Sequence, residues 1–263
     1  MFPDKIPLKP TTKTLPNGSK LVYRTPALVR ATHWLIALSL FVLFLSGLQI
    51  FNAHPALYWG NASEFDQPLL SFGGGDRAFP SWITLPAEQD LAGGRRWHFF
   101  FAWCLVAGLG VYLVANLSRG RIGRDLLPTG NELPGIGRSA LDHLRLRFPH
   151  GEKARHYNVL QKVAYLGVMF VVIPLVILTG LALSPAIDTA FPPLLFIFGG
   201  RQSARSLHFF GTTILFLFFV VHILMVVAAG PINEMRSIIT GWFAIRAVPD
   251  PKSTNVKQVH DSD

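Results

Sequence analysis

The chain has 263 residues, of which 50% are apolar and only 15% are charged. Soluble domains carry about 25% charged residues, so this composition argues against a soluble globular protein. Lysine and arginine outnumber aspartate and glutamate by 24 to 15, which gives a net charge of +9. These charges flank long apolar runs, so they indicate contact with a membrane surface rather than with nucleic acid. The single cysteine, Cys104, excludes an intrachain disulfide bond and any Cys-x-x-Cys metal or redox motif.

Four stretches contain no Asp, Glu, Lys or Arg and are long enough to cross a bilayer, which takes about 20 residues. They are Ala31–Phe51, Trp97–Ser118, Val163–Ile187 and Ser206–Asn233. We therefore predict an all-α membrane protein, a four-transmembrane-helix bundle over residues 25–245. Its helices are expected at about 29–51, 97–118, 158–184 and 205–230, between tails at 1–24 and 246–263 whose outer parts are poorly ordered.

Two features interrupt this pattern. The apolar run Phe191–Gly200 is too short to span a bilayer and contains two prolines, so we interpret it as a turn at the membrane interface. Pro174 lies inside the third apolar stretch, and we expect it to bend that helix.

The distribution of basic residues sets the expected orientation of the bundle. Six Lys or Arg residues and one acidic residue precede the first apolar stretch, and eight Lys or Arg residues lie between the second and third predicted helices, at 119–157. The segment between the first and second stretches instead holds five acidic and three basic residues. Both termini and the basic middle loop are therefore predicted to be cytoplasmic, and the acidic segment and the third connection are predicted to lie outside.

Four of the nine histidines lie at or inside the predicted spans, where ionisable residues are rare and usually functional. His208 and His222 share the fourth helix and are about four turns apart, so both imidazoles face the same side. A rise of about 21 Å between them places one near each membrane face. His98 opens the second helix at the outer depth, and His33 lies in the first turn of the first helix at the inner depth. Matching depths predicts the pairs His98/His208 and His33/His222.

Two opposed histidines at one depth are the arrangement that holds a haem iron from both faces. No Cys-x-x-Cys-His sequence occurs, so covalent attachment is excluded and two b-type haems are predicted. Zinc is the rival metal, but neither pair has a nearby Cys, Asp or Glu, and structural zinc takes four ligands. An iron held by two histidines has no open position, so the expected role is electron transfer across the bilayer.

Weaker features surround these histidines. Gly47 on the first helix and Gly211, one turn after His208, would let a porphyrin approach, although small residues also simply pack helices together. Arginines near the helix ends could neutralise haem propionates or merely anchor the helices in the membrane. These are Arg95, Arg96, Arg201 and Arg205 on the outer side and Arg24 and Arg30 on the inner side.

The histidines lie in recognisable motifs: R-A-T-H-W at Arg30–Trp34, R-R-W-H-F at Arg95–Phe99 and R-S-L-H-F-F-G at Arg205–Gly211, followed by His222. With the G-P-I-N-E-M-R-S-I-I-T-G-W segment after the fourth helix, they resemble the bacterial di-haem cytochrome b561 and nickel-iron hydrogenase b-type cytochrome superfamily. The chain looks most like the branch that accompanies periplasmic molybdopterin oxidoreductases. The resemblance covers residues 25–245 and implies a bacterial inner-membrane protein with a quinone site near the inner haem and a periplasmic enzyme docked over the outer one.

Candidate residues follow for both exchange partners. Quinone chemistry needs protons, so a polar inner rim is expected, although a solvated headgroup rim is the plainer interpretation of the same residues. The rim candidates are Asn233, Glu234 and Arg236, with Arg30, His156, Tyr157, Asn158 and Lys162 beside them. The long outer segment forms either a partner interface or a lid over the outer haem. Its possible aromatic anchors are Trp59, Phe72, Phe79 and Trp82.

Three classes of function remain open from the sequence. The leading one is an electron-transfer subunit of an oxidoreductase complex, between the quinone pool and a periplasmic molybdopterin enzyme, with a hydrogenase-type cytochrome b subunit as its alternative. A histidine-based ion or proton transporter predicts carboxylates within the spans, which are absent. A passive membrane anchor would not need four depth-matched histidines.

Overall fold

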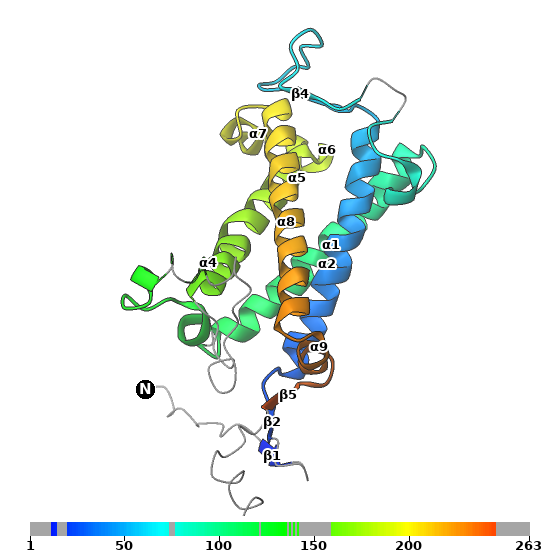
Figure 1. Cartoon of the computed structure of the whole chain (residues 1–263). Coiled ribbons are helices and arrows are strands. Elements are labelled where there is room, and N and C mark those ends of the chain that lie inside the picture. Colours follow the sequence, from blue (N-terminus) through cyan, green and yellow to red (C-terminus); the bar gives the residue numbers. More distant parts are fainter. Residues whose placement is uncertain are drawn as a thin grey trace, which may run out of the picture.

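The computed structural model describes residues 12–14, 20–73, 77–120, 122–135, 137, 139, 141 and 159–245. Four helical spans are long and apolar enough to cross a membrane (Figure 1). They are α1 (Ala27–Asn52), α2 (Leu91–Leu117), the third span Val159–Leu183, and α8 (Arg201–Ala229). The predicted helical membrane class and its four spans are therefore confirmed.

Two helices begin earlier than predicted because a search for uncharged runs stops at arginine, whereas a helix does not. The α2 helix starts after Asp90, whose carboxylate accepts the backbone N–H of Gly93 at 2.8 Å and caps the first turn. The α8 helix starts at Arg201, directly after two glycines with positive φ that reverse the chain. Arginines at both helix starts are thus part of the helices.

The third span is irregular at the expected proline. It consists of α4 (Val159–Gly167), the π-helical turn η5 (Val168–Val172) and α5 (Ile173–Leu183), so Pro174 lies at the start of α5. Proline has no N–H to donate to the preceding turn, and a widened π turn is a common way to accommodate such an interruption. The predicted disturbance at Pro174 therefore takes the form of η5.

The helices pack closely in two pairs, α1 with α2 and α5 with α8. Glycines on α2 make the first approach possible, because a Cβ at Gly108 would lie 3.1 Å from Leu35 and one at Gly94 would lie 3.0 Å from Gln49. A Cβ at Gly211 of α8 would lie 2.7 Å from Val176 of α5. Small residues that allow backbones to approach are the usual means of helix association in membranes.

An apolar layer fills the middle of the bundle. Leu109, Ile173 and Leu215, from three different spans, are buried together there. Phe44 of α1 stacks on Phe216 of α8, with ring centroids 4.5 Å apart and planes 7° from parallel. This layer separates the two ends of the bundle.

We call the end that carries the first and last described residues the terminal end. A three-stranded antiparallel sheet covers it, in the order β1 (Thr12–Thr14), β2 (Lys20–Tyr23) and β5 (Trp242–Ile245), next to α9 (Pro231–Thr240) (Figure 1). Val22 pairs with Phe243, and both are buried. Two strands therefore lie within the range 1–24, which the sequence suggested was only a tail.

We call the opposite end the loop end. Between α1 and α2 it holds a short hairpin of β3 (Ala56–Leu57) and β4 (Leu70–Ser71) and the 3₁₀ turn η1 (Ser81–Ile83). Between α5 and α8 it holds α6 (Pro185–Ala190) and α7 (Pro193–Ile197), so part of the predicted interfacial turn is helical. The connection that leaves α2 at the terminal end and leads to α4 contains η2 (Ile122–Leu126) and η3 (Leu133–Gly135).

Candidate functional site

The structure brings the four span histidines together as two pairs. At the loop end, the ring centroids of His98 on α2 and His208 on α8 lie 6.1 Å apart, with planes 62° from parallel. At the terminal end, the ring centroids of His33 on α1 and His222 on α8 lie 6.5 Å apart, at an angle of 50°. These are the pairs that matching depths along the helices predict.

Both separations suit a metal ion held between two imidazoles. Bonds of about 2.0 Å from the ion to each nitrogen, plus the distance from nitrogen to ring centre, place the centroids roughly 6.4 Å apart. Among the described residues no group of three or more His, Cys, Asp or Glu side chains is placed to hold a metal ion. Two ligands in line suit haem iron, whose porphyrin supplies the other four, and do not suit structural zinc.

Each imidazole at the loop end is fixed through its Nδ1 atom by a hydroxyl on a neighbouring helix. His98 Nδ1 lies 3.1 Å from Ser46 Oγ on α1, and His208 Nδ1 lies 3.1 Å from Thr179 Oγ1 on α5. The carbonyl of Val176 also accepts from His208 Nδ1 at 3.0 Å. Both rings therefore leave Nε2 free to bind a metal ion.

A glycine follows each of these hydroxyl residues and lies against the same ring. A Cβ at Gly47 would lie 3.5 Å from His98 Cε1, and a Cβ at Gly180 would lie 3.2 Å from His208 Cε1. Gly47 was expected near the loop-end site, but its open space is filled by an imidazole. Gly211 instead faces Val176, so its lack of a side chain serves the packing of α8 on α5.

The sequence reasoning missed Ser46, Thr179 and Gly180. A signal was present, because Leu45–Leu48 reads L-S-G-L and Leu178–Leu181 reads L-T-G-L. This four-residue similarity is too short to count as an internal repeat. It becomes meaningful only when both segments are seen to lie against histidines.

The arginines at the loop end have protein partners. Arg205 donates to the carbonyls of Ala56 at 2.9 Å and His54, and its guanidinium lies over the ring of Phe51. Arg205 thus holds the segment after α1 onto α8, and its expected contact with a haem propionate stays a prediction.

The other loop-end arginines lie at the surface. Arg201 forms an ion pair with Asp188 at 3.4 Å. Arg95 lies over the ring of Phe99, and Arg96 is exposed near the start of α2. For all four arginines expected near a haem at this end, that role stays a prediction, and Arg96 is the one whose side chain is exposed without a contact described above.

The aromatic residues of the loop end fall into two groups. Phe72 and Phe79 pack against Phe51 at the end of α1, with ring centroids 5.4 and 5.9 Å from it. Trp59 and Trp82 are instead exposed, at 61% and 82% of their surface. Only the two tryptophans are therefore available as anchors for a partner.

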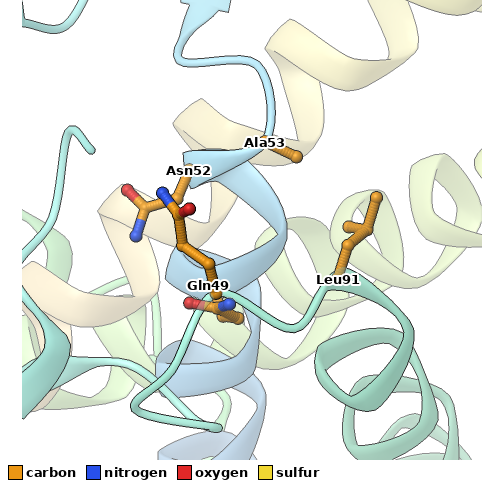
Figure 2. Close-up of a pocket in the computed structure, with 5 residues that line it drawn as sticks. Gln49, Asn52, Ala53 and Leu91 are labelled. Atoms are coloured by element: carbon orange, nitrogen blue, oxygen red, sulfur yellow. The ribbon is translucent and has the colours of Figure 1, made fainter. Parts of the chain in front are cut away.

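A cavity of about 290 Å³ lies beside this end of α1, lined by Gln49, Asn52, Ala53, Gln89 and Leu91 (Figure 2). Its buried amides are already engaged. Gln49 donates to the Glu88 carbonyl at 2.7 Å and accepts from Arg77, and Asn52 makes two hydrogen bonds with the backbone of Phe79. The side-chain amides of Gln49 and Asn52 therefore hold the loop in place through hydrogen bonds within the protein.

The terminal-end pair has a different environment. His222 stacks on Phe218, with centroids 6.0 Å apart. His33 Nδ1 is buried without a hydrogen-bond partner among the described residues, and so is Nη1 of Arg30, one turn earlier on α1. Arg30 lies directly against Gly241, whose φ of 90° and lack of a Cβ allow this approach. The unsatisfied guanidinium nitrogen of Arg30, one turn from His33, fits an acceptor such as a haem propionate.

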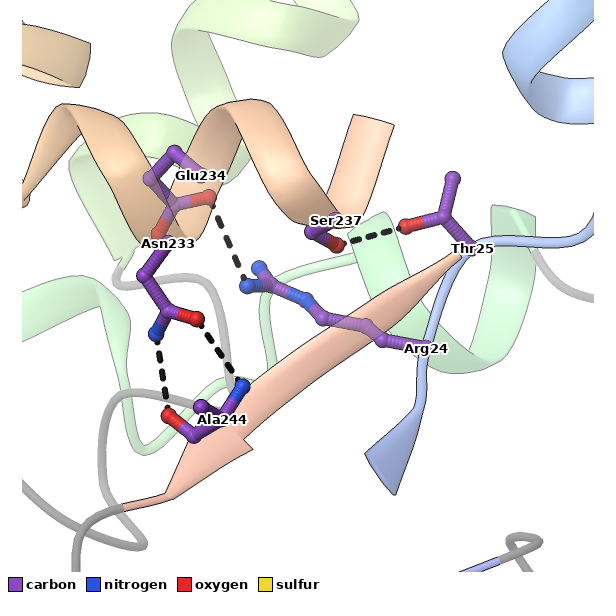
Figure 3. A network of polar contacts seen from close by, with 6 residues as sticks. All are labelled: Arg24, Thr25, Asn233, Glu234, Ser237 and Ala244. Carbon is purple, nitrogen blue, oxygen red and sulfur yellow. Dashed lines mark hydrogen bonds and ion pairs between the residues drawn. The ribbon is translucent and has the colours of Figure 1, made fainter. Parts of the chain in front are cut away.

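Polar contacts beyond this pair join α9 to the sheet (Figure 3). Asn233 exchanges two hydrogen bonds of 2.9 Å with the backbone of Ala244. Glu234 lies 3.7 Å from Arg24, and Thr25 and Ser237 share a hydrogen bond of 3.0 Å. Glu234 is thus paired with Arg24 and only half-buried, whereas Asn233 serves to dock β5.

The remaining rim candidates are dispersed. Lys162 is buried and forms an ion pair with Glu132 at 2.9 Å, so it joins the turn before η3 to α4. The Thr129 N–H and Lys162 hold the pKa of Glu132 below its usual range. Arg236 lies half-buried on α9. His156, Tyr157 and Asn158 lie outside the described residues.

Comparisons with known proteins identify the family and a relative of the chain. The family model of prokaryotic cytochrome b561 matches residues 24–241. The protein-methionine-sulfoxide reductase subunit YedZ1 of Azospira oryzae is 32% identical over 209 residues, which is 79% of this chain and 92% of that subunit.

Proposed function

The chain belongs to the prokaryotic cytochrome b561 family, and we propose that it is a di-haem membrane subunit that carries electrons between quinone and an oxidoreductase outside the membrane. As a member of this family, the chain is a multi-pass cytochrome b of the bacterial inner membrane. Proteins of the family bind b-type haem and take part in electron transport. The number of haems, the quinone and the partner are the proposed parts.

The observation that carries the proposal is the presence of two histidine pairs, one at each end of the bundle. His98/His208 and His33/His222 each have the spacing of two imidazoles on one iron, at opposite ends of the bundle. When bound there, each haem supplies an iron that accepts and releases one electron. The four histidines would hold the two haems, one pair to each, and two histidines on one iron would leave no site for substrate.

The relative of Azospira oryzae supports a reductase as the partner. Its name assigns it to a reductase of protein methionine sulfoxide, an enzyme that consumes two electrons and two protons for each sulfoxide it reduces. We infer that the partner here is a periplasmic molybdopterin enzyme of this kind, supplied with electrons from quinol, rather than a hydrogenase. The loop end then faces the periplasm, and both termini face the cytoplasm, as the basic residues predict.

A transporter is the second class to separate. Such proteins use carboxylates within their spans, whereas the four spans contain no Asp or Glu. The bundle accordingly offers histidines but no acidic relay between its ends.

Haem counting and histidine substitution test the proposal. We expect two haems per purified chain, loss of one haem in His98→Ala or His208→Ala, and loss of the other in His33→Ala or His222→Ala, measured by pyridine haemochrome assay and redox titration. His54→Ala should leave both spectra unchanged. A colourless protein from haem-replete cells, or loss of both haems in every variant, would overturn it.

A further inference from the structure

The loop-end site is built with an internal symmetry that the sequence barely shows. His98 and His208 approach each other from α2 and α8, and each is backed by a different helix, α1 or α5. On each backing helix a hydroxyl and the next glycine contact the Nδ1 and Cε1 edge of the ring: Ser46 with Gly47, and Thr179 with Gly180. Carbonyl groups three residues earlier, of Leu43 and Val176, face the same two rings.

The hydrogen bonds of the hydroxyls define the tautomer of both histidines. Ser46 Oγ donates its own hydrogen to the Val42 carbonyl at 2.7 Å, and Thr179 Oγ1 donates to the Leu175 carbonyl at 2.7 Å. Each hydroxyl can therefore only accept from the imidazole, so the ring hydrogen lies on Nδ1. The Nε2 lone pair is then free, on the side of the ring that faces the opposite histidine.

We propose that Ser46 and Thr179 are positioning residues of the loop-end haem, which hold His98 and His208 as Nδ1–H tautomers and lower the reduction potential of the iron they ligate. This inference rests on the proposed binding of haem between these histidines. An imidazole that donates from Nδ1 is a stronger electron donor at Nε2, which stabilises ferric over ferrous iron.

In the terminal-end pair, the ring of His33 on α1 has no hydroxyl partner of this kind among the described residues. His33 Nδ1 is buried without a hydrogen-bond partner among the described residues. The two centres therefore differ in the protein groups behind their ligands, and removal of a hydroxyl should affect only one of them.

Redox titration of the purified protein, with low-temperature electron paramagnetic resonance of the ferric haems, tests the proposal. In Ser46→Ala and Thr179→Val we expect two bound haems and an upward shift of one midpoint potential, the one lost in His98→Ala. The loss of one hydrogen bond should change the ratio of reduced to oxidised haem at fixed potential by about threefold to tenfold, tenfold being 59 mV for one electron. The double variant should shift by the sum, because the hydroxyls act on different ligands.

Matched variants distinguish the effect of the hydrogen bond to the histidine from the effect of side-chain packing. Ser46→Thr and Thr179→Ser keep the acceptor and should restore the potential. Ser39→Ala, seven residues before Ser46, removes a fully buried hydroxyl that has no hydrogen-bond partner among the described residues, and it should change nothing. Unchanged potentials in Ser46→Ala and Thr179→Val with both haems bound would overturn this inference alone. If the unmodified protein contains no haem that His98→Ala removes, the proposed function is overturned instead.

Discussion

Gly47 and Gly180 determine how closely the imidazoles of His98 and His208 approach the helices behind them. A Cβ at Gly47 would make an ordinary contact of 3.5 Å, whereas one at Gly180 would lie 3.2 Å from His208 Cε1 and force the ring to move. We predict that Gly180→Ala alters the spectrum of the loop-end haem or lowers its occupancy, and that Gly47→Ala has a smaller effect.

Gly110→Ala is the matched control for this prediction. It places a Cβ on α2 where no neighbouring atom lies within 4 Å, so the absorption spectrum and haem content should match those of the unmodified protein. Equal effects of the alanine at positions 47, 110 and 180 would show that the close approach to the rings has no influence on the haem.

At the residue scale, the sequence predicts the histidine pairs because helical rise and phase are regular over 14 residues. Fixed geometry along one helix converts sequence spacing into depth, and depth suffices to match partners. The second contacts of the same rings depend on which face of α1 or α5 meets them, and spacing within one helix does not contain that information. Ser46 and Thr179 were missed for this reason, and so were the backbone carbonyls to which Arg205 donates.

At the scale of elements, the uncharged runs predict the spans well because desolvation in a bilayer penalises charge over the whole length of a helix. The same signal says nothing about β2 and β5, which are four residues long and pair across more than 200 residues of sequence. It also says little about the loop end, where the segment between α1 and α2 is held by side-chain contacts of Gln49, Asn52 and Arg205.

The loop-end segment makes a prediction of its own about partner binding. Trp59 and Trp82 are exposed, and truncation of an interface tryptophan typically costs about 2 kcal/mol or more, which is roughly a 30-fold loss of affinity. We predict that Trp59→Ala or Trp82→Ala weakens co-purification of the periplasmic partner by this order while both haems remain.

Two control variants define the origin of that effect. Trp103→Ala removes a tryptophan that is 63% exposed on the membrane-spanning part of α2, and it should leave the complex intact. Phe72→Ala removes a ring packed against Phe51 and should lower thermal stability instead. Complexes of unchanged affinity in both Trp59→Ala and Trp82→Ala would favour the alternative that this segment is a lid over the haem.

At the scale of the whole molecule, the two ends of the bundle each carry a histidine pair but differ in the groups around it. Two histidine pairs lie at opposite ends of α8, and an apolar layer with Leu109, Ile173 and Leu215 lies between them. The terminal end, where His33 and His222 lie, also carries the charged groups Arg30, Arg24 and Glu234. In the proposed function, electrons pass along the bundle between two irons, whereas the described residues of the apolar layer offer no path for protons. Protons from quinol must therefore leave at the same end at which quinol is oxidised.

We predict that Glu234 takes up those protons at the terminal end. It is 31% exposed and lies 3.7 Å from Arg24, so it contacts both solvent and the polar network between α9 and the sheet. We predict that Glu234→Gln, which keeps the size of the side chain, slows haem reduction by a quinol analogue at least about tenfold, since general bases typically contribute more than this. Stability should hardly change, because an exposed ion pair contributes about 0–1 kcal/mol. Asp188→Asn is the matched control, since it breaks a similar pair with Arg201 at the loop end. Stopped-flow reduction across pH with both haem spectra intact is the measurement. If Asp188→Asn slows reduction and Glu234→Gln does not, then quinol is oxidised at the loop end beside His98 and His208.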